Sequence, residues 1–278
     1  MSCSGNCNTC STDCDERKPS KEDFSVPANK FTNVKKMIGI VSGKGGVGKS
    51  MVTSLLSVLL NRKGYQTAIL DADVTGPSIP KTFGIHGKVD ANQDGIIPAV
   101  SSTGIKIMSS NLLLDTEDTP VIWRGPIIAG AVKQFWSEVL WQDVDYMFID
   151  MPPGTGDVPL TVFQSLPIDG IVIVTSPQEL VSMIVSKAVN MANAMEVPVL
   201  GLIENYSYVQ CGNCGEKIQV FGESHVDLVA EKFGLPVLAK IPIDPALAWT
   251  LDHEAVEDFQ GDWLDEAVKK IEADLSCK

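Results

Sequence analysis

The sequence contains no long apolar run. No stretch approaches the ~18 consecutive apolar residues that cross a bilayer as a helix. Residues 1–36 are polar and lack the apolar stretch of a secretory signal. We therefore expect a cytoplasmic protein that has no membrane partner.

Positive charge is also scarce. The chain has 22 Lys and Arg against 35 Asp and Glu, a formal net charge of −13. This balance argues against nonspecific binding to nucleic acid or anionic lipid, which needs clustered basic residues. The negative net charge does not argue against a nucleotide site, because such a site needs only a few local cations and backbone amides. The Asn-Lys-x-Asp element that reads guanine in GTPases is absent too, so a GTPase is the less favoured reading.

The 278 residues, 44% apolar and 21% charged, suit one large α/β domain. Short apolar runs typical of buried strands alternate with helical patterns, which predicts a mainly parallel twisted sheet flanked by helices. The predicted strands are residues 37–42, 67–70, 146–149, 170–174, 197–203 and 236–241, and the predicted helices are 49–62, 130–141, 178–195 and 224–233. Residues 95–108 predict a hairpin or edge insertion instead.

The two ends of the chain do not belong to this alternation of strands and helices. Residues 1–33 are polar, cysteine-rich and without apolar period, so we interpret them as a flexible arm before a domain of residues 34–278. Residues 263–275 carry a helical apolar stripe whose polar face is mostly acidic. Because lipid-binding helices need a basic face, we expect this helix to cover the core.

A glycine-rich segment, GKGGVGKS at residues 43–50, lies between a predicted strand and a predicted helix. Its G-x-x-x-x-G-K-S spacing lets backbone amides and the helix N-terminus face phosphates. Lys49 would neutralise the β and γ phosphates, and the Ser50 hydroxyl would hold Mg²⁺. The alternative is a simple strand-to-helix turn, which the flanking strand and helix disfavour. The segment therefore predicts a P-loop nucleotide hydrolase.

Acidic residues follow two of the predicted strands. Asp150 ends the run 146–149, where a carboxylate can face a Mg²⁺ shell, although it could also be a turn former or cap. Asp71 and Asp73 follow residues 67–70, at the strand ends where open α/β sheets bind ligands. One of these two aspartates is expected to position the attacking water.

The seven cysteines fall into two groups and one isolated residue. These are Cys3, Cys7, Cys10 and Cys14, then Cys211 and Cys214, then Cys277. In a reducing cytosol, clustered cysteines indicate metal ligands or redox groups. The C-x-x-C pair by itself fits half of an iron–sulfur site, half of a zinc site or a redox dithiol. The only nearby donor that could complete a zinc ribbon within the chain is His225.

The glycine-rich segment has an additional early lysine, Lys44. Because of this lysine, the sequence resembles the deviant P-loop ATPases that include MinD, ParA and the nitrogenase iron protein. The resemblance implies that family's fold. It also implies that Lys44 reaches the nucleotide of a partner subunit, so that ATP joins a homodimer.

A narrower resemblance is to the Mrp/ApbC family of iron–sulfur cluster carrier ATPases. The segments that carry it are residues 71–80 (DADVTGPSIP), 150–157 (DMPPGTGD) and 204–214 (ENYSYVQCGNC). It implies slow ATP hydrolysis coupled to binding a labile 4Fe-4S cluster and transferring it to apo iron–sulfur proteins, with a cluster assembly scaffold as a further partner.

The same resemblance implies roles for individual residues. Asp73 would orient the water, Asp150 would support Mg²⁺, and Asn205 would contact adenine. Cys211 and Cys214 of two subunits would bridge one cluster through four thiolates, whereas nitrogenase-type donors use two widely separated cysteines per subunit. The implied nucleotide-binding residues are Gly43, Lys44, Gly45, Gly46, Val47, Gly48, Lys49, Ser50, Met51 and Asn205, and the implied catalytic residues are Lys44, Lys49, Asp73 and Asp150.

Two alternatives stay open beside the carrier. One is a MinD-like positioning ATPase, and the other is a zinc-binding scaffold in which the nucleotide is structural. The four amino-terminal cysteines, spaced C-x3-C-x2-C-x3-C, could hold a second cluster or zinc. Their spacing is shorter than that of the cysteine-rich extensions of related proteins.

Overall fold

The computed structural model describes residues 24–74, 76, 78–114, 125–177 and 181–274. Its centre is a sheet of eight strands, in which every neighbouring pair is parallel except β5 and β6. In spatial order the strands are β12 (Val237–Lys240), β9 (Val199–Glu204), β8 (Gly170–Thr175), β1 (Asn33–Ser42), β7 (Asp143–Asp150), β2 (Thr67–Asp71), β6 (Lys106–Met108) and β5 (Ala99–Val100). The predicted fold class is confirmed.

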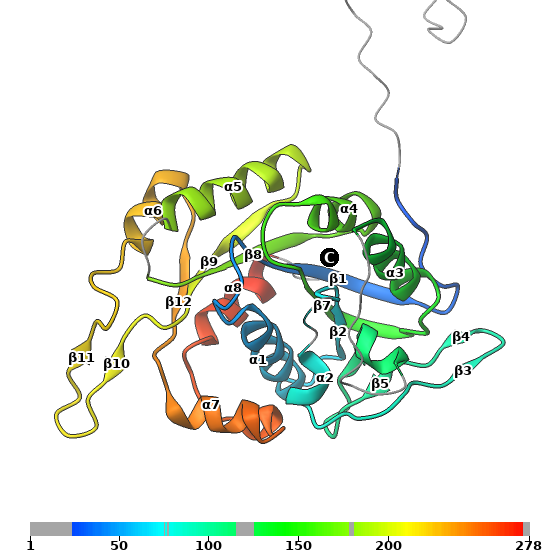
Figure 1. Ribbon diagram of the computed structural model, residues 1–278, viewed down its shortest axis with the longest axis horizontal. Coiled ribbons are helices and arrows are strands. Elements are labelled where there is room, and N and C mark those ends of the chain that lie inside the picture. The colour runs from blue at the N-terminus through cyan, green and yellow to red at the C-terminus, as the bar shows by residue number, and fades with distance from the viewer. Residues whose placement is uncertain (1–23, 75, 77, 115–124, 178–180, 275–278) are drawn as a thin grey trace, which may run out of the picture.

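Helices cover both faces of the sheet (Figure 1). One face packs against α3 (Gly125–Ser137), α4 (Asp157–Ser165), α5 (Val181–Ala194) and α6 (Val226–Phe233). The other packs against α1 (Lys49–Arg62), α2 (Ile79–Thr82), α7 (Pro245–Asp252), α8 (Asp265–Asp274) and the short turn η3 (Val256–Asp258). A further short turn, η2 (Ser110–Leu113), follows β6.

Strand β7 shows why the sheet needs cover on both faces. Tyr146 and Phe148 belong to the core that contains α1, while Met147 and Ile149 belong to the core on the opposite face. The side chains alternate because successive residues of a strand point to opposite sides. Each fully buried side chain of this size contributes about 1.5–3 kcal/mol, so β7 is stabilised from both layers.

The segment predicted to be an edge insertion lies at the sheet edge. Within residues 95–108, β5 pairs antiparallel with β6, and β6 pairs with β2. The first residues, β4 (Gly95–Ile96), form a separate small ladder with β3 (Ala91–Asn92). A second small ladder joins β10 (Val209–Gln210) to β11 (Lys217–Ile218), a hairpin that stands out from the sheet (Figure 1).

The two ends of the described chain pack onto the domain. Val26, in the range that we assigned to the arm, accepts a 2.8 Å hydrogen bond from Trp136 Nε1 through its carbonyl, and its amide donates to Ser165 O. Helix α8 buries Ala267, Val268 and Ile271, so the expectation that it covers the core is confirmed. Residues 1–23, which carry the four amino-terminal cysteines, and Cys277 lie outside the described residues. Among the residues that are described, no helix is both long and apolar enough to cross a membrane.

Candidate functional site

The carboxyl ends of β1, β7 and β2 lie side by side, because the three strands are parallel neighbours. Asp150 is in register with Ile40 of β1 and with Asp71 of β2. The glycine-rich segment and both acidic segments therefore meet at one sheet edge, which is where open α/β sheets bind ligands.

The phosphate loop, residues 43–50, connects β1 to α1, whose first residue is Lys49 as predicted. Gly46 has a φ of 78° and Gly48, the N-cap of α1, has a φ of 83°. These left-handed conformations strain any residue with a Cβ, which explains glycine at both positions. At Gly48 a Cβ would also lie 2.2 Å from Asn205 Nδ2. The loop is thus shaped by its sequence and by a neighbour that follows β9.

A pocket of about 360 Å³ opens over this loop. It is lined by residues 44–51 of the predicted set, and Asp73 contributes to its wall. Asp150 and Asn205 are almost fully buried behind it, each 1% exposed. The pocket wall also includes Tyr206, Leu251 and Thr82, which the sequence did not single out.

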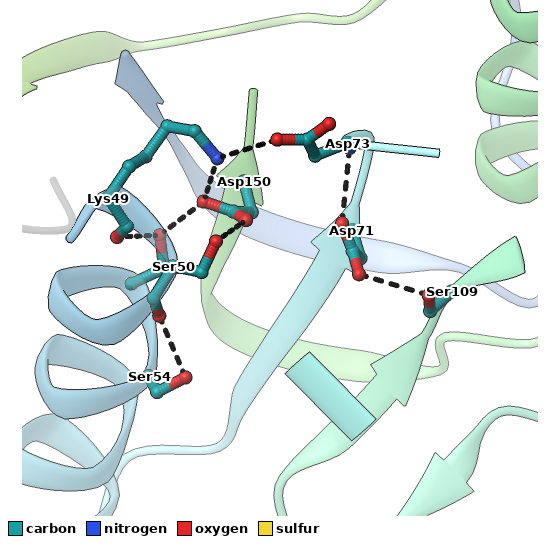
Figure 2. A network of polar contacts seen from close by, with 8 residues as sticks. Lys49, Ser50, Ser54, Asp71, Asp73, Ser109 and Asp150 are labelled. Atoms are coloured by element: carbon teal, nitrogen blue, oxygen red, sulfur yellow. Dashed lines mark hydrogen bonds and ion pairs between the residues drawn. The ribbon is translucent and has the colours of Figure 1, made fainter. Parts of the chain in front are cut away.

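Asp150 is the centre of a polar network under the pocket (Figure 2). Its Oδ2 accepts a 2.6 Å hydrogen bond from Ser50 Oγ, and its Oδ1 accepts a 2.9 Å bond from Thr53 Oγ1. Lys49 Nζ lies 2.8 Å from Oδ1. Lys49 and Asp150 are 6% and 1% exposed, so each charge is compensated by the other away from water. A carboxylate beside a serine hydroxyl is also a set of hard oxygen donors that fits Mg²⁺.

The two aspartates at the carboxyl end of β2, Asp71 and Asp73, have different surroundings. Asp73 is 16% exposed, lines the pocket and places Oδ2 3.5 Å from Lys49 Nζ. Asp71 is fully buried, and its oxygens accept hydrogen bonds from Ser109 Oγ and from the Asp73 amide. Burial, followed by the nearby charge of Asp150, raises the pKa of Asp71 well above its usual value. Asp73 is thus the aspartate of this pair that reaches the pocket.

Asn205 is engaged at both ends of its amide. Nδ2 donates a 3.0 Å hydrogen bond to the carbonyl of Val47, and Oδ1 accepts a 2.9 Å bond from the Tyr206 amide. In this arrangement Asn205 holds the phosphate loop, and the predicted contact with adenine stays a prediction. Tyr206 itself has a φ of 60°, an uncommon conformation for a bulky residue. Tyr206 is also one of the residues that line the pocket.

Cys211 and Cys214 occupy the turn of the β10–β11 hairpin. The Cys211 amide donates to Glu216 O, and the Gly215 amide donates to Cys211 O, both at 2.9 Å. Cys211 is half-buried and Cys214 is exposed, and both are free thiols. Hydrogen bonds from the Cys214 and Asn213 amides lower the pKa of the Cys211 thiol. Among the described residues, no group of three or more metal-ligating side chains comes together, so this part of one chain offers two thiolates.

Three residues of the site carry weak sequence signals. Thr53 lies one helical turn after Lys49, so a helical reading places its side chain on the same face as the lysine. Leu251 lies on α7, whose start has the signature Asp244-Pro245, an N-cap followed by proline. Tyr206 lies in the segment 204–214 that carries the narrower resemblance, but no residue pattern places it on the pocket wall.

Comparison with known proteins agrees with a nucleotide site of this kind. Residues 33–275 match the family model ParA, described as NUBPL iron-transfer P-loop NTPase. An iron–sulfur cluster carrier protein of Clostridium perfringens is 43% identical over 269 residues, covering 92% of this chain and 94% of that protein.

Solved structures agree. A nucleotide-binding protein from Archaeoglobus fulgidus, in complex with ADP, has a TM-score of 0.75 and 43% identity over 83% of this chain and 90% of its own. The cell division ATPase MinD of Pyrococcus furiosus has a TM-score of 0.59 at 18% identity, covering 86% of this chain and 99% of its own, which shows a shared fold. The predicted resemblances are confirmed. The chain belongs to the ParA family of iron-transfer P-loop NTPases of the NUBPL type.

Proposed function

We propose that this chain binds and hydrolyses ATP and carries a labile 4Fe-4S cluster, bridged between two subunits, to apo iron–sulfur proteins. The observation that carries the proposal is the presence, in one chain, of a phosphate loop that lines a pocket and of two free cysteine thiols, one half-buried and one exposed. The first suits a nucleotide, and the second supplies half of the thiolates that such a cluster needs. A second copy of the chain supplies the other half.

On the nucleotide side, Lys49 neutralises the β and γ phosphates, and the amides of the phosphate loop bind their oxygens. Ser50 and Asp150 would hold Mg²⁺, which would supply positive charge against the phosphates. Asp73 orients the attacking water. Support for this role comes from its place on the pocket wall and its 3.5 Å approach to Lys49. Lys44, which also lines the pocket, contacts the nucleotide of the partner subunit.

On the cluster side, Cys211 and Cys214 bind as thiolates. The lowered pKa of Cys211 favours the thiolate form, and the exposure of Cys214 leaves it accessible to a second subunit and to a recipient. Relatives named iron–sulfur cluster carrier protein support this side of the proposal, and the solved neighbour in complex with ADP supports the nucleotide side. Loops after Asp73 and Asp150 would reset the docking of the subunits on hydrolysis.

The proposed setting is the cytoplasm, with a cluster assembly scaffold as the donor of the cargo. The positioning alternative loses support from α8, because its apolar stripe packs into the core instead of facing a lipid surface. Metal analysis, described next, distinguishes the zinc-scaffold alternative from the carrier.

The test is anaerobic reconstitution with iron and sulfide, followed by iron, sulfide and zinc analysis and an absorption spectrum. We expect about four irons and four sulfides per dimer. Cys211→Ser with Cys214→Ser should lose them, whereas the matched control Cys277→Ser should keep them. Zinc bound to the wild-type chain and not displaced by reconstitution would favour the scaffold.

A phosphate-release assay with Mg²⁺ and ATP tests the proposed ATP hydrolysis. We expect slow release that Lys49→Met abolishes and that the double cysteine variant retains, because no cysteine is needed for phosphoryl chemistry. If the wild-type chain binds ATP without releasing phosphate, the nucleotide is structural and the proposed hydrolysis is wrong.

A further inference from the structure

Strand β9 ends in two adjacent residues that bind different parts of the domain. Glu204 is the last residue of β9, where it is in register with Thr175 of β8 and Lys240 of β12. Asn205 follows, and its backbone N–H donates a hydrogen bond to the Thr175 carbonyl. Both side chains are buried, at 0% and 1% exposed. The end of this strand is therefore fixed by the sheet on both sides.

Glu204 holds the two ends of the segment that carries the cysteines. We call residues 207–224 the cysteine segment. Glu204 Oε2 accepts a 2.5 Å hydrogen bond from Ser207 Oγ, and Oε1 accepts a 2.7 Å bond from Ser224 Oγ. Between these serines the chain leaves the domain, forms the β10–β11 hairpin with its cysteine turn, and returns to α6. One carboxylate thus closes the base of the segment.

Asn205 holds the phosphate loop. Its Nδ2 donates to the Val47 carbonyl at 3.0 Å, and Val47 is itself 2% exposed. Val47 lies between Gly46 and Gly48, the two residues with left-handed backbone conformations. Because a Cβ on Gly48 would lie 2.2 Å from Nδ2, the loop backbone and the asparagine are in close contact. The loop cannot shift at Val47 without moving or breaking this contact.

We propose that Glu204 is a positioning residue and that the Glu204–Asn205 pair links the phosphate loop to the cysteine segment, so that nucleotide in the pocket changes the mobility of the hairpin bearing Cys211 and Cys214. The inference deepens the proposed function and rests on it for its biological meaning.

The physical basis is that neither contact is easily given up. A buried carboxylate that loses one of its two hydroxyl partners keeps its desolvation cost without the compensating bond, so the two serines stay at the base of the segment. A shift of Val47 would move the Asn205 side chain that is bonded to it. Because Asn205 and Glu204 are adjacent in the chain, the shift would also affect Glu204. Coupling between sites is a free energy, and it acts in both directions. A cluster on the cysteines would therefore change nucleotide affinity as well.

Hydrogen exchange of the full-length chain, with and without ADP and magnesium, tests the link without needing a cluster. In the wild type we expect ADP to slow exchange of the cysteine segment by about fivefold or more, a common size for coupling between sites. Ser224→Ala removes one contact of Glu204 and should reduce this response to less than about twofold. ADP affinity should stay within about twofold, because Ser224 is not among the residues that line the pocket.

Two further variants separate coupling from a general loss of stability. Glu204→Gln should keep the response, because its amide can accept from one serine hydroxyl and donate to the other. Ser57→Ala is the matched control: it removes a buried hydroxyl bond of 3.1 Å to Thr67, the first residue of β2, and it touches neither Glu204 nor Asn205. It should keep the response in full.

The link is wrong if ADP leaves the cysteine segment of the wild type unchanged, or if Ser224→Ala responds to ADP as the wild type does. It is also wrong if Ser57→Ala loses the response equally, because the effect would then be general. Failure of the proposed carrier function would show differently, as an absence of iron and sulfide after reconstitution, with the exchange response intact.

Discussion

Lys49 Nζ and Asp150 Oδ1 lie 2.8 Å apart, with both side chains buried. Removing the lysine leaves the carboxylate with two hydroxyl donors and no cation. Because an unpaired buried charge is costly, we expect Lys49→Met to lower the free energy of unfolding by about 3–5 kcal/mol. The double variant Lys49→Met with Asp150→Asn should recover much of this loss, and neither variant should hydrolyse ATP. Urea unfolding measures the stability.

The control for that experiment is Lys35→Met. Lys35 pairs with Asp145 at 2.7 Å, but Lys35 is 51% exposed, and a surface pair contributes about 0–1 kcal/mol. Equal losses for the two lysine variants would contradict the interpretation of a buried, mutually dependent pair.

Gly48 carries two constraints, its positive φ and its approach to Asn205. We expect Gly48→Ala to lower ADP affinity and to cost more stability than the ~1–2 kcal/mol of a left-handed residue alone. The matched control is Gly64→Ala, where φ is 94° and nothing lies within 4 Å of the added Cβ. Titration calorimetry and thermal unfolding measure the two effects. If both glycine variants lost equal stability, contact with Asn205 would not matter.

Tyr206 combines an uncommon backbone conformation with a place on the pocket wall. In Tyr206→Gly, relief of the left-handed strain is offset by the greater freedom of glycine in the unfolded chain, so stability should change by less than about 1 kcal/mol. ADP affinity should nevertheless fall, since the side chain is gone. Tyr206→Phe keeps the ring and should bind ADP as the wild type does. A glycine variant with unchanged affinity would remove Tyr206 from the site.

Glu257 joins η3 to the loop between β5 and β6, because its carboxylate accepts hydrogen bonds from Ser101, Ser102 and Thr103. Burial acts to raise the pKa of Glu257, but these donors outweigh it, and the net pKa lies below the ordinary 4.5. A depressed pKa in the folded state gives stability that is present above pH 4.5 and is lost as pH falls through the folded pKa.

The test compares wild type and Glu257→Gln by unfolding between neutral pH and pH 3. We expect the wild type to be the more stable at neutral pH and the difference to shrink on acidification below 4.5. A difference that stays constant with pH would show that the charge of Glu257 contributes nothing.

Local signals predicted much of the fold. Helix α1 has the predicted bounds, because glycines stand on both sides of its apolar pattern. The helix predicted at residues 130–141 is instead α3, which ends at Ser137. Val139 and Trp141 continue the apolar pattern, but they are buried by tertiary packing outside the helix, and Trp141 Nε1 donates to Phe135 O. Helices α4 and α7 were not predicted.

The site divides in the same way. The phosphate loop and the aspartates at the carboxyl ends of β2 and β7 could be placed at one edge from the predicted parallel sheet and the motif spacing. The contacts of Asn205 with Val47 and of Glu204 with Ser224 could not, because they join residues 158 and 20 positions apart in the chain. Such contacts depend on how β9 and its neighbours pack, which no local pattern encodes.

The sheet ends on one side in β5, a strand of only two residues that runs against its neighbour. So short an edge offers few unpaired backbone groups to an incoming strand, which blunts the tendency of open sheets to pair end to end. Copies of this chain are thereby discouraged from joining sheet to sheet on that side into extended fibres. On that side, contacts between copies would have to use loops and side chains, and such contacts form and break without rearranging the sheet.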